Sequence, residues 1–167
     1  MNWRKRPKLE IFKPEINPFS IEVAIKNNGN SSAVNCYVRI TLHKADEDVI
    51  SAPRNAYITK ENPKSKIFED YVTWGISPNP VRINIPPHLS DRANIGEVVT
   101  DSSKGQILRI ASENTYKPPR VHLVVSIDKH YSGQFIFGAD NCRPKMKNFR
   151  ISFYENDNKL VGKIELD

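Results

Sequence analysis

The four histidines are the first residues to test for chemistry, because imidazole serves both metal sites and catalytic triads. His43 and His122 fall on the polar side of alternating segments, so we expect them on the surface. His88 and His130 fall in predicted turns. A site would need two histidines to converge with a carboxylate, and their spacing indicates no such convergence. The histidines therefore favour neither a metal centre nor a triad.

Acidic residues in two predicted loops are the next candidates. Asp46, Glu47 and Asp48 adjoin in one loop, and Asp91 and Asp101 lie in another. Carboxylates bind calcium, but a calcium loop places its ligands at alternate positions, and that pattern is missing. The chain also lacks a Gly-x-Ser-x-Gly elbow and a glycine-rich phosphate loop. We therefore expect solvated acids, no enzyme activity and no cofactor.

Two cysteines are too few for a disulfide scaffold. Cys36 falls on the apolar side of its segment, which predicts a buried thiol. A bridge from Cys36 to Cys142 would require a secreted context that the sequence does not show. Without a Cys-x-x-Cys pair or a Cys/His cluster, no zinc site is expected.

Basic and aromatic side chains on predicted strands form a further candidate surface, although the acids between them also fit an ordinary solvated face. Aromatic and basic residues on a sheet face can stack on bases and contact phosphates, so a nucleic-acid-binding β-domain is the alternative function. Lys147 and Arg150 extend this basic set. The same surface is our candidate for contact with a protein partner, and its residues are Tyr37, Arg39, Arg143 and Lys145.

The segment that must position these residues runs from Phe19 to His43. Apolar residues alternate with polar ones before and after the polar turn at residues 27–32. A period of two indicates half-buried β-strands, here a predicted hairpin. The expected inward residues are Ile21, Val23 and Ile25, then Val34, Cys36, Val38, Ile40 and Leu42.

Further segments alternate in the same way, and no segment shows a helical period over eleven residues. They lie at residues 9–12, 57–59, 67–74, 81–85, 95–99, 107–111, 121–127, 134–138, 149–154 and 160–166. With 12 prolines between them, they predict an all-β fold, an immunoglobulin-like antiparallel β-sandwich of roughly eight or nine strands. The long loops expected at residues 44–66 and 86–105 are our first candidate for a functional surface, because sandwich domains often bind partners through loops.

The charge is concentrated at the start of the chain. Residues 1–13 hold five cations and one acid, and so carry +4 of the net +6. We expect residues 1–8 to be a flexible basic arm and residues 9–167 to be one domain. The arm could follow a membrane helix, with Arg4, Lys5, Arg6 and Lys8 tethering the domain to a membrane surface. That arrangement favours the cytoplasmic face or the cytoplasm; otherwise an extracellular location is expected.

The stretch from Ser20 to Leu42, with Ile25-Lys-Asn-Asn-Gly-Asn-Ser-Ser-Ala33 at its centre, resembles the strand-Asn-x-Gly-x-x-x-Ala-strand signature of CARDB-type immunoglobulin-like modules. Those are cell-adhesion-related domains of bacteria and archaea. The resemblance covers about one seventh of the chain. It implies a non-catalytic interaction or accessory module with an unknown protein partner.

Overall fold

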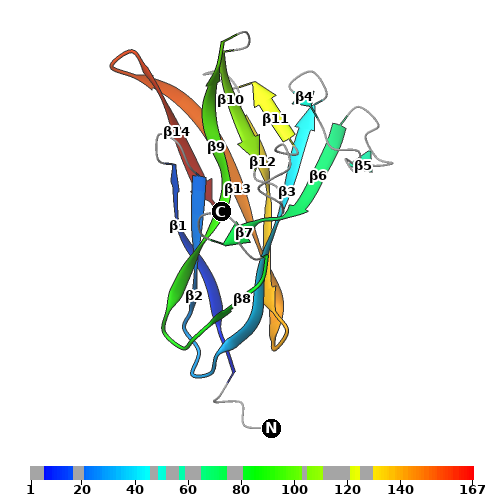
Figure 1. Ribbon diagram of the computed structural model, residues 1–167, viewed down its shortest axis with the longest axis vertical. Helices are drawn as coiled ribbons and strands as arrows, with labels where there is room; N and C mark the ends of the chain where they lie inside the picture. Colours follow the sequence, from blue (N-terminus) through cyan, green and yellow to red (C-terminus); the bar gives the residue numbers. More distant parts are fainter. Residues whose placement is uncertain are drawn as a thin grey trace.

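The computed structural model describes residues 6–16, 21–45, 49–51, 57–58, 65–74, 81–102, 105–110, 121–124 and 130–167. The regular secondary structure of these described residues consists of β-strands alone. The strands form two curled antiparallel sheets that face each other (Figure 1). Nine strands have six or more residues and five are shorter, so the predicted all-β, two-sheet architecture is confirmed.

The first sheet, called here the β2 sheet, has seven strands. In spatial order they are β1 (Leu9–Ile16), β2 (Ile21–Asn27), β9 (Ser90–Asp101), β10 (Gly105–Ile110), β11 (Val121–Val124) and β4 (Val49–Ser51), with β7 (Thr73–Trp74) also paired to β9.

The second sheet, called here the β3 sheet, also has seven strands. In spatial order they are β14 (Lys159–Leu166), β13 (Cys142–Asn156), β12 (His130–Ala139), β3 (Ala33–Ala45), β6 (Ser65–Tyr71) and β5 (Tyr57–Ile58), with β8 (Ile83–Ile85) also paired to β3.

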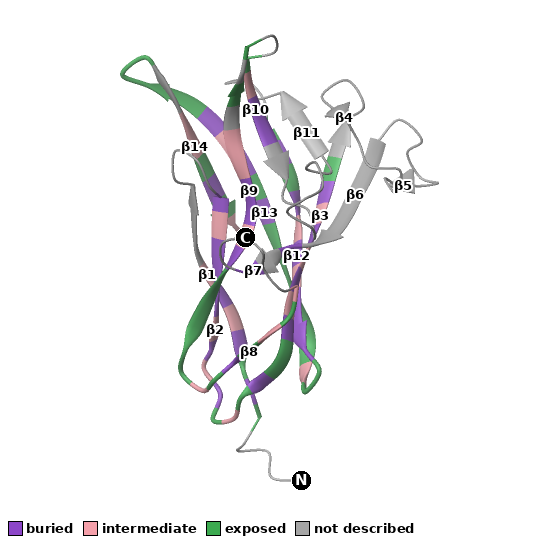
Figure 2. Cartoon of the chain, viewed as in Figure 1, coloured by how far each residue is buried: buried purple, intermediate pink, exposed green. Residues whose placement is uncertain are grey.

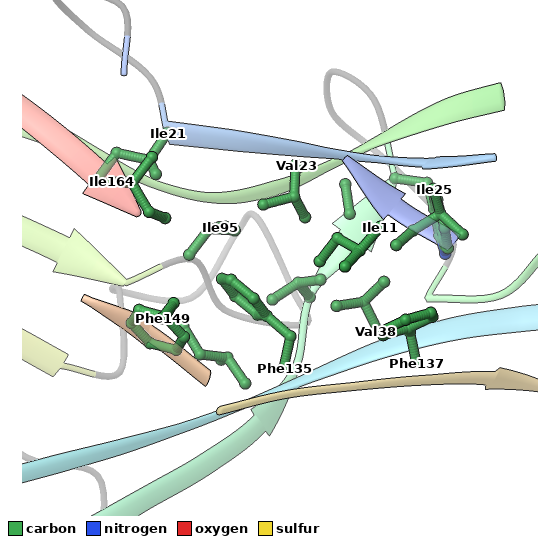
Figure 3. Close-up of a cluster of buried hydrophobic side chains, with 14 of the residues drawn as sticks. Ile11, Ile21, Val23, Ile25, Val38, Ile95, Phe135, Phe137, Phe149 and Ile164 are labelled. Carbon is green, nitrogen blue, oxygen red and sulfur yellow. The ribbon is translucent and has the colours of Figure 1, made fainter. Parts of the chain in front are cut away.

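The core lies between the two sheets. Apolar side chains from both sheets point toward one another there (Figure 3). Phe135 and Phe149 stack with ring centroids 4.3 Å apart, and Tyr131 meets Phe153 edge-on at 6.0 Å. Such pairs add to the free energy that burial of their area already provides. The buried set includes Ile21, Val23, Ile25, Cys36, Val38, Ile40 and Leu42, as the alternation predicts.

The predicted hairpin between the segments around Ile21 and Leu42 is wrong. β2 pairs with β1 and β9, whereas β3 pairs with β12, β6 and β8. The turn at residues 28–32 therefore carries the chain from one sheet to the other (Figure 1). Alternation shows that a strand has one buried face, but a strand in either sheet satisfies it.

Asn27 ends β2 and is fully buried. Its side-chain oxygen accepts hydrogen bonds from the backbone N–H groups of Lys8 (3.1 Å) and Gly29 (3.0 Å). Its amide nitrogen donates to the carbonyl oxygens of Ser31 (2.8 Å) and Ile85 (3.0 Å). All four hydrogen-bonding positions of the amide are thus used. Asn27 joins β2, the inter-sheet turn, β8 and the start of the chain.

Gly29 is needed for close approach. The sequence suggests that glycine supplies positive φ at this turn, but no positive φ occurs there among the described glycines. Instead, a Cβ on Gly29 would lie 2.3 Å from the carbonyl oxygen of Arg6 and 2.6 Å from the Cα of Pro7. Pro7 is buried, and the backbone N–H of Asn28 donates a hydrogen bond to the carbonyl oxygen of Lys8 at 2.8 Å. Residues 6–8 of the basic arm therefore pack on the domain.

Val34 departs from the predicted alternation. It is 37% exposed, while Ala33 and Cys36 are both fully buried. The pairing of β3 with β8 shifts between Ala33 and Cys36, and Asn35 between them has φ = 52°. A bulge of this kind inserts an extra residue and reverses the face of those that follow. The prediction that Val34 is buried is therefore wrong.

Two predicted loops are largely strands. Most of the loop expected at residues 86–105 is β9, of which the sequence predicts only residues 95–99 as a strand; β9 pairs with β2 on one side and β10 on the other. The sequence also predicts a turn at residues 130–133 and a polar loop at residues 139–147. The first belongs to β12, and the second is a tight turn followed by β13. Polar residues hid these strands because one side of each long strand faces solvent.

The sequence predicts a closing hairpin with its turn at residues 156–158, and that hairpin is confirmed. Asn156 of β13 pairs with Lys159 of β14, so the turn has two residues and Asn156 belongs to the strand. Asp157 and Asn158 in that turn have φ values of 49° and 61°. Asn and Asp tolerate positive φ, which this hairpin turn requires at both positions.

We predict that Asn27→Ala lowers the free energy of unfolding by about 2–4 kcal/mol, because it leaves buried backbone groups without partners. Chemical denaturation measures this change. Asn148→Ala is the matched control, since Asn148 is exposed and accepts one hydrogen bond from Gln134 at 3.0 Å. The control should lose less than about 1 kcal/mol. Equal losses in the two variants would contradict the role given to Asn27.

Candidate functional site

The outer surface of the β3 sheet brings together two of the four predicted surface residues. Tyr37 and Arg39 alternate with the buried Val38, so they lie on the outer face. Arg39 is in register with Ile136 on β12, and Ile136 is in register with Met146 on β13. We call Tyr37, Arg39, Ile136 and Met146 the outer patch.

Met146 is the residue of the outer patch that the sequence did not predict. It is 64% exposed, more than the other large apolar side chains called exposed in the described part of the chain. It was missed because residues 139–147 read as a polar loop. The alternation Lys145-Met146-Lys147 was the signal that could have placed Met146 on a strand face.

Tyr37 sits in a polar network at one end of the sheets. The guanidinium carbon of Arg82 lies 5.0 Å from the centroid of the Tyr37 ring, in cation–π geometry. Arg82 also reaches Asp140 at 3.5 Å, and Asn35 donates to the same carboxylate at 2.7 Å. The network fixes the β3 bulge against the β12–β13 turn.

Lys145 lies on the core-facing side of β13, opposite to the outer patch. It is in register with the buried Phe137. Its ammonium group crosses to the β2 sheet and donates to the carbonyl oxygen of Leu9 on β1 at 2.8 Å. The structure therefore separates Lys145 from Tyr37 and Arg39. Arg143, the fourth predicted residue, is exposed near the β12–β13 turn.

One part of β13 forms an open edge of the β3 sheet. β14 pairs with β13 only from Phe149 onward, and no described strand pairs with residues 142–147 on that side. Residues 143–148 are all exposed, as the exposed colouring near the β12–β13 turn shows (Figure 2). We call residues 142–147 the open edge.

A shallow groove of about 680 Å³ lies on the same outer face, farther along β13. Gln134 donates to Asn148 in its floor at 3.0 Å. Glu165, which lines the groove, forms an ion pair with Lys163 at 2.7 Å. Their hydrogen bond raises the pKa of Lys163 and lowers that of Glu165. The lining residues are His43, Ser132, Gly133, Gln134, Asn148, Phe149, Arg150, Glu165, Leu166 and Asp167.

Among the remaining candidates, His43 is exposed and lines this groove. His88 and His130 are also exposed, and His130 is in a strand instead of the predicted turn. Arg4, Lys5 and the acids at residues 46–48 lie outside the described residues. Within the described ranges, no three potential metal ligands cluster, and no helix is long and apolar enough to cross a membrane.

The two cysteines are free thiols, and Cys36 is fully buried as predicted. The Cys36 thiol donates to the carbonyl oxygen of Ala33 at 3.5 Å. Burial raises the pKa of Cys36 to about 11, because the thiolate would lose its hydration. Cys142 is partly exposed and packs against the rim of the core.

A scan against protein-family models and searches of curated proteins and of solved structures found no match to this chain.

We predict that Lys145→Ala lowers the free energy of unfolding by about 0.5–1.5 kcal/mol, because the carbonyl group of Leu9 loses its hydrogen bond from the ammonium group. Urea denaturation measures this change. Lys147→Ala is the control, since Lys147 lies two residues along on the same face of β13. The control should change the free energy by less than about 0.5 kcal/mol. A larger loss in Lys147→Ala than in Lys145→Ala would contradict the bridge between the sheets.

We also predict that Cys36 stays unreactive in the folded protein at pH 8. In a Cys142→Ser variant, Ellman's reagent should modify Cys36 only after denaturant is added, whereas Cys142 in a Cys36→Ser variant should react without denaturant. The raised pKa gives a second test. The stabilisation of the folded state that the raised pKa represents is present below pH 9. It is lost as the pH rises to about 11, because the Cys36 thiol ionises at a lower pH in the unfolded chain than in the folded protein. Rapid modification of folded Cys36 would contradict its burial.

Proposed function

We propose that this protein is a non-catalytic interaction module that contacts a protein partner through the outer patch. The carrying observation is that Met146, 64% exposed, lies in register with Ile136, which is itself in register with Arg39 on the outer face of the β3 sheet. Tyr, Met and Arg are enriched at protein interfaces, and hot spots are enriched in Tyr and Arg. The outer patch combines these residue types on regular strands that hold them in place.

We propose further that the module is immunoglobulin-like, as its CARDB-type signature implies. In an immunoglobulin domain, strands G, F and C are neighbours in one sheet and A and B are neighbours in the other. The orders β13-β12-β3 and β1-β2 support that correspondence. The next two strands depart from it. In an immunoglobulin domain strand E lies beside B and follows D in the chain. Here β9 lies beside β2 and precedes its other neighbour, β10, in the chain.

The signature residues support the same proposal. Asn27 and Gly29 form the connection between β2 and β3, which lie in different sheets, and Ala33 begins β3 fully buried. In immunoglobulin domains, strands B and C likewise lie in different sheets.

We predict that Arg39→Glu combined with Met146→Glu reduces capture of the partner at least tenfold. The reason is that two new charges would have to be buried in the contact. Immobilised protein is exposed to an extract of the source cells, and recovered proteins are quantified by mass spectrometry. The matched control is Lys26→Glu combined with Leu89→Glu, which changes one lysine and one 57%-exposed leucine elsewhere.

The wild-type protein and the control pair should recover the same partner in similar amounts. Thermal unfolding of all three proteins verifies that each is folded. Recovery of no protein above the empty support, or equal recovery by all three, would contradict the proposed function.

A further inference from the structure

The open edge of β13 exposes backbone groups as well as side chains. Asp167 donates its N–H to the carbonyl oxygen of Asn148 at 3.1 Å, so the peptide groups of Asn148 point toward the β14 side. Groups two residues apart in a strand point the same way. The N–H and carbonyl groups of Met146 therefore point away from β12, along the plane of the sheet, to the side where no described strand pairs with them.

A row of outward backbone groups is a template for one more strand. Extended peptides bind such edges by main-chain hydrogen bonds, and alternate side chains provide specificity. Proteins protect edges that must stay unpaired with lysine, proline or a covering segment. The open edge carries Pro144, Lys145 and Lys147. Pro144 points the same way as Met146 but has no N–H, so its carbonyl group and both peptide groups of Met146 are the ones offered to a strand. Residues 143–148 are exposed.

The charge of β13 indicates which peptide fits. Residues 142–154 hold Arg143, Lys145, Lys147 and Arg150 and no acid. Asp140, two residues before the open edge, is paired with Arg82 at 3.5 Å. Glu165 and Asp167 lie on or just after β14, past the other end of the open edge. Two such cationic edges repel each other, so this charge disfavours pairing between two copies of the chain. An acidic strand is attracted.

Single-stranded nucleic acid is the other anionic ligand to consider. Binding of bases requires an aromatic ring with an accessible face. Tyr37, the aromatic residue of the outer patch, has Arg82 over its ring. The open edge instead provides unpaired peptide groups, which favour a peptide.

We propose that the open edge binds an extended acidic peptide as an added strand beside Met146. Acidic side chains of the peptide would face Lys145 and Lys147, and alternate apolar ones would lie beside Met146. This inference rests on the proposed interaction function and names the class of partner for it.

The test is selection from a displayed library of random twelve-residue peptides against the intact protein, followed by affinity measurements on synthetic selected peptides. We expect acidic residues at alternate positions. N-methylation of the alternate amides that face β13 should weaken binding at least tenfold, and methylation of the other set less than threefold, because only one set pairs.

Protein variants provide the second arm. Met146→Pro removes the outward N–H and should weaken binding at least tenfold, whereas Met146→Ala keeps that group and should lose less. Arg143→Glu combined with Lys147→Glu should also cost at least tenfold, and Lys26→Glu should have no effect. The methylated peptides keep the test valid even where Met146→Pro perturbs folding.

Four results would overturn the inference. One is the absence of any selected peptide, and another is equal affinity of both methylated sets. The third is tighter binding of a poly-dT oligonucleotide, which would assign the charge to nucleic acid. The fourth is a dimer that Met146→Pro abolishes, which would assign the edge to a second copy. Failure here together with successful capture through the outer patch rejects the strand-addition inference alone, whereas failure of both tests rejects the interaction function too.

Discussion

The buried amide of Asn27 is the interaction on which the arrangement of the two sheets depends. Four hydrogen bonds from this side chain reach the start of the chain, the inter-sheet turn and β8. Its backbone adds two more, from its N–H to Leu89 and from His88 to its carbonyl oxygen. A buried amide costs free energy unless each donor and acceptor is paired, so these segments must meet in one geometry.

That constraint joins several turns at one end of the molecule. The inter-sheet turn, the β8–β9 turn and residues 6–8 all contact Asn27 or Gly29. At the same end, Asn141 accepts from the N–H of Val34 and donates to the carbonyl oxygen of Ser32. Side chains of asparagine therefore do at the turns what backbone pairing does within the sheets.

Along one side of the molecule, β1 is the last strand of the β2 sheet. There the ammonium group of Lys145 on β13 donates a hydrogen bond to the carbonyl oxygen of Leu9 on β1. Because the pairing of β14 with β13 ends at Phe149, no described strand pairs with residues 142–147 on that side. The outer patch and the open edge thus share Met146: its side chain belongs to the face and its peptide groups belong to the edge. A partner can contact both at once.

The two proposals differ in how directly the structure supports them. The outer patch is a composition of side chains on a face, which many sheets offer. The open edge is a set of oriented backbone groups with a charge of one sign beside it, which narrows the partner by both shape and charge. The experiments separate them because Met146→Ala changes the side chain and Met146→Pro changes the peptide group as well.

By itself, the sequence determined the all-β architecture, the buried faces of Ile21–Asn27 and of residues 36–42, the buried Cys36 thiol and the position of the closing hairpin turn. Each of these follows from local alternation or from the φ preference of particular residues. The partner of each strand was decided only by the tertiary structure, because alternation is the same in either sheet. So were the outward Val34, the strands hidden in residues 86–105 and 139–147, and the separation of Lys145 from Tyr37 and Arg39. These depend on bulges and register between segments far apart in the chain, which no local pattern encodes.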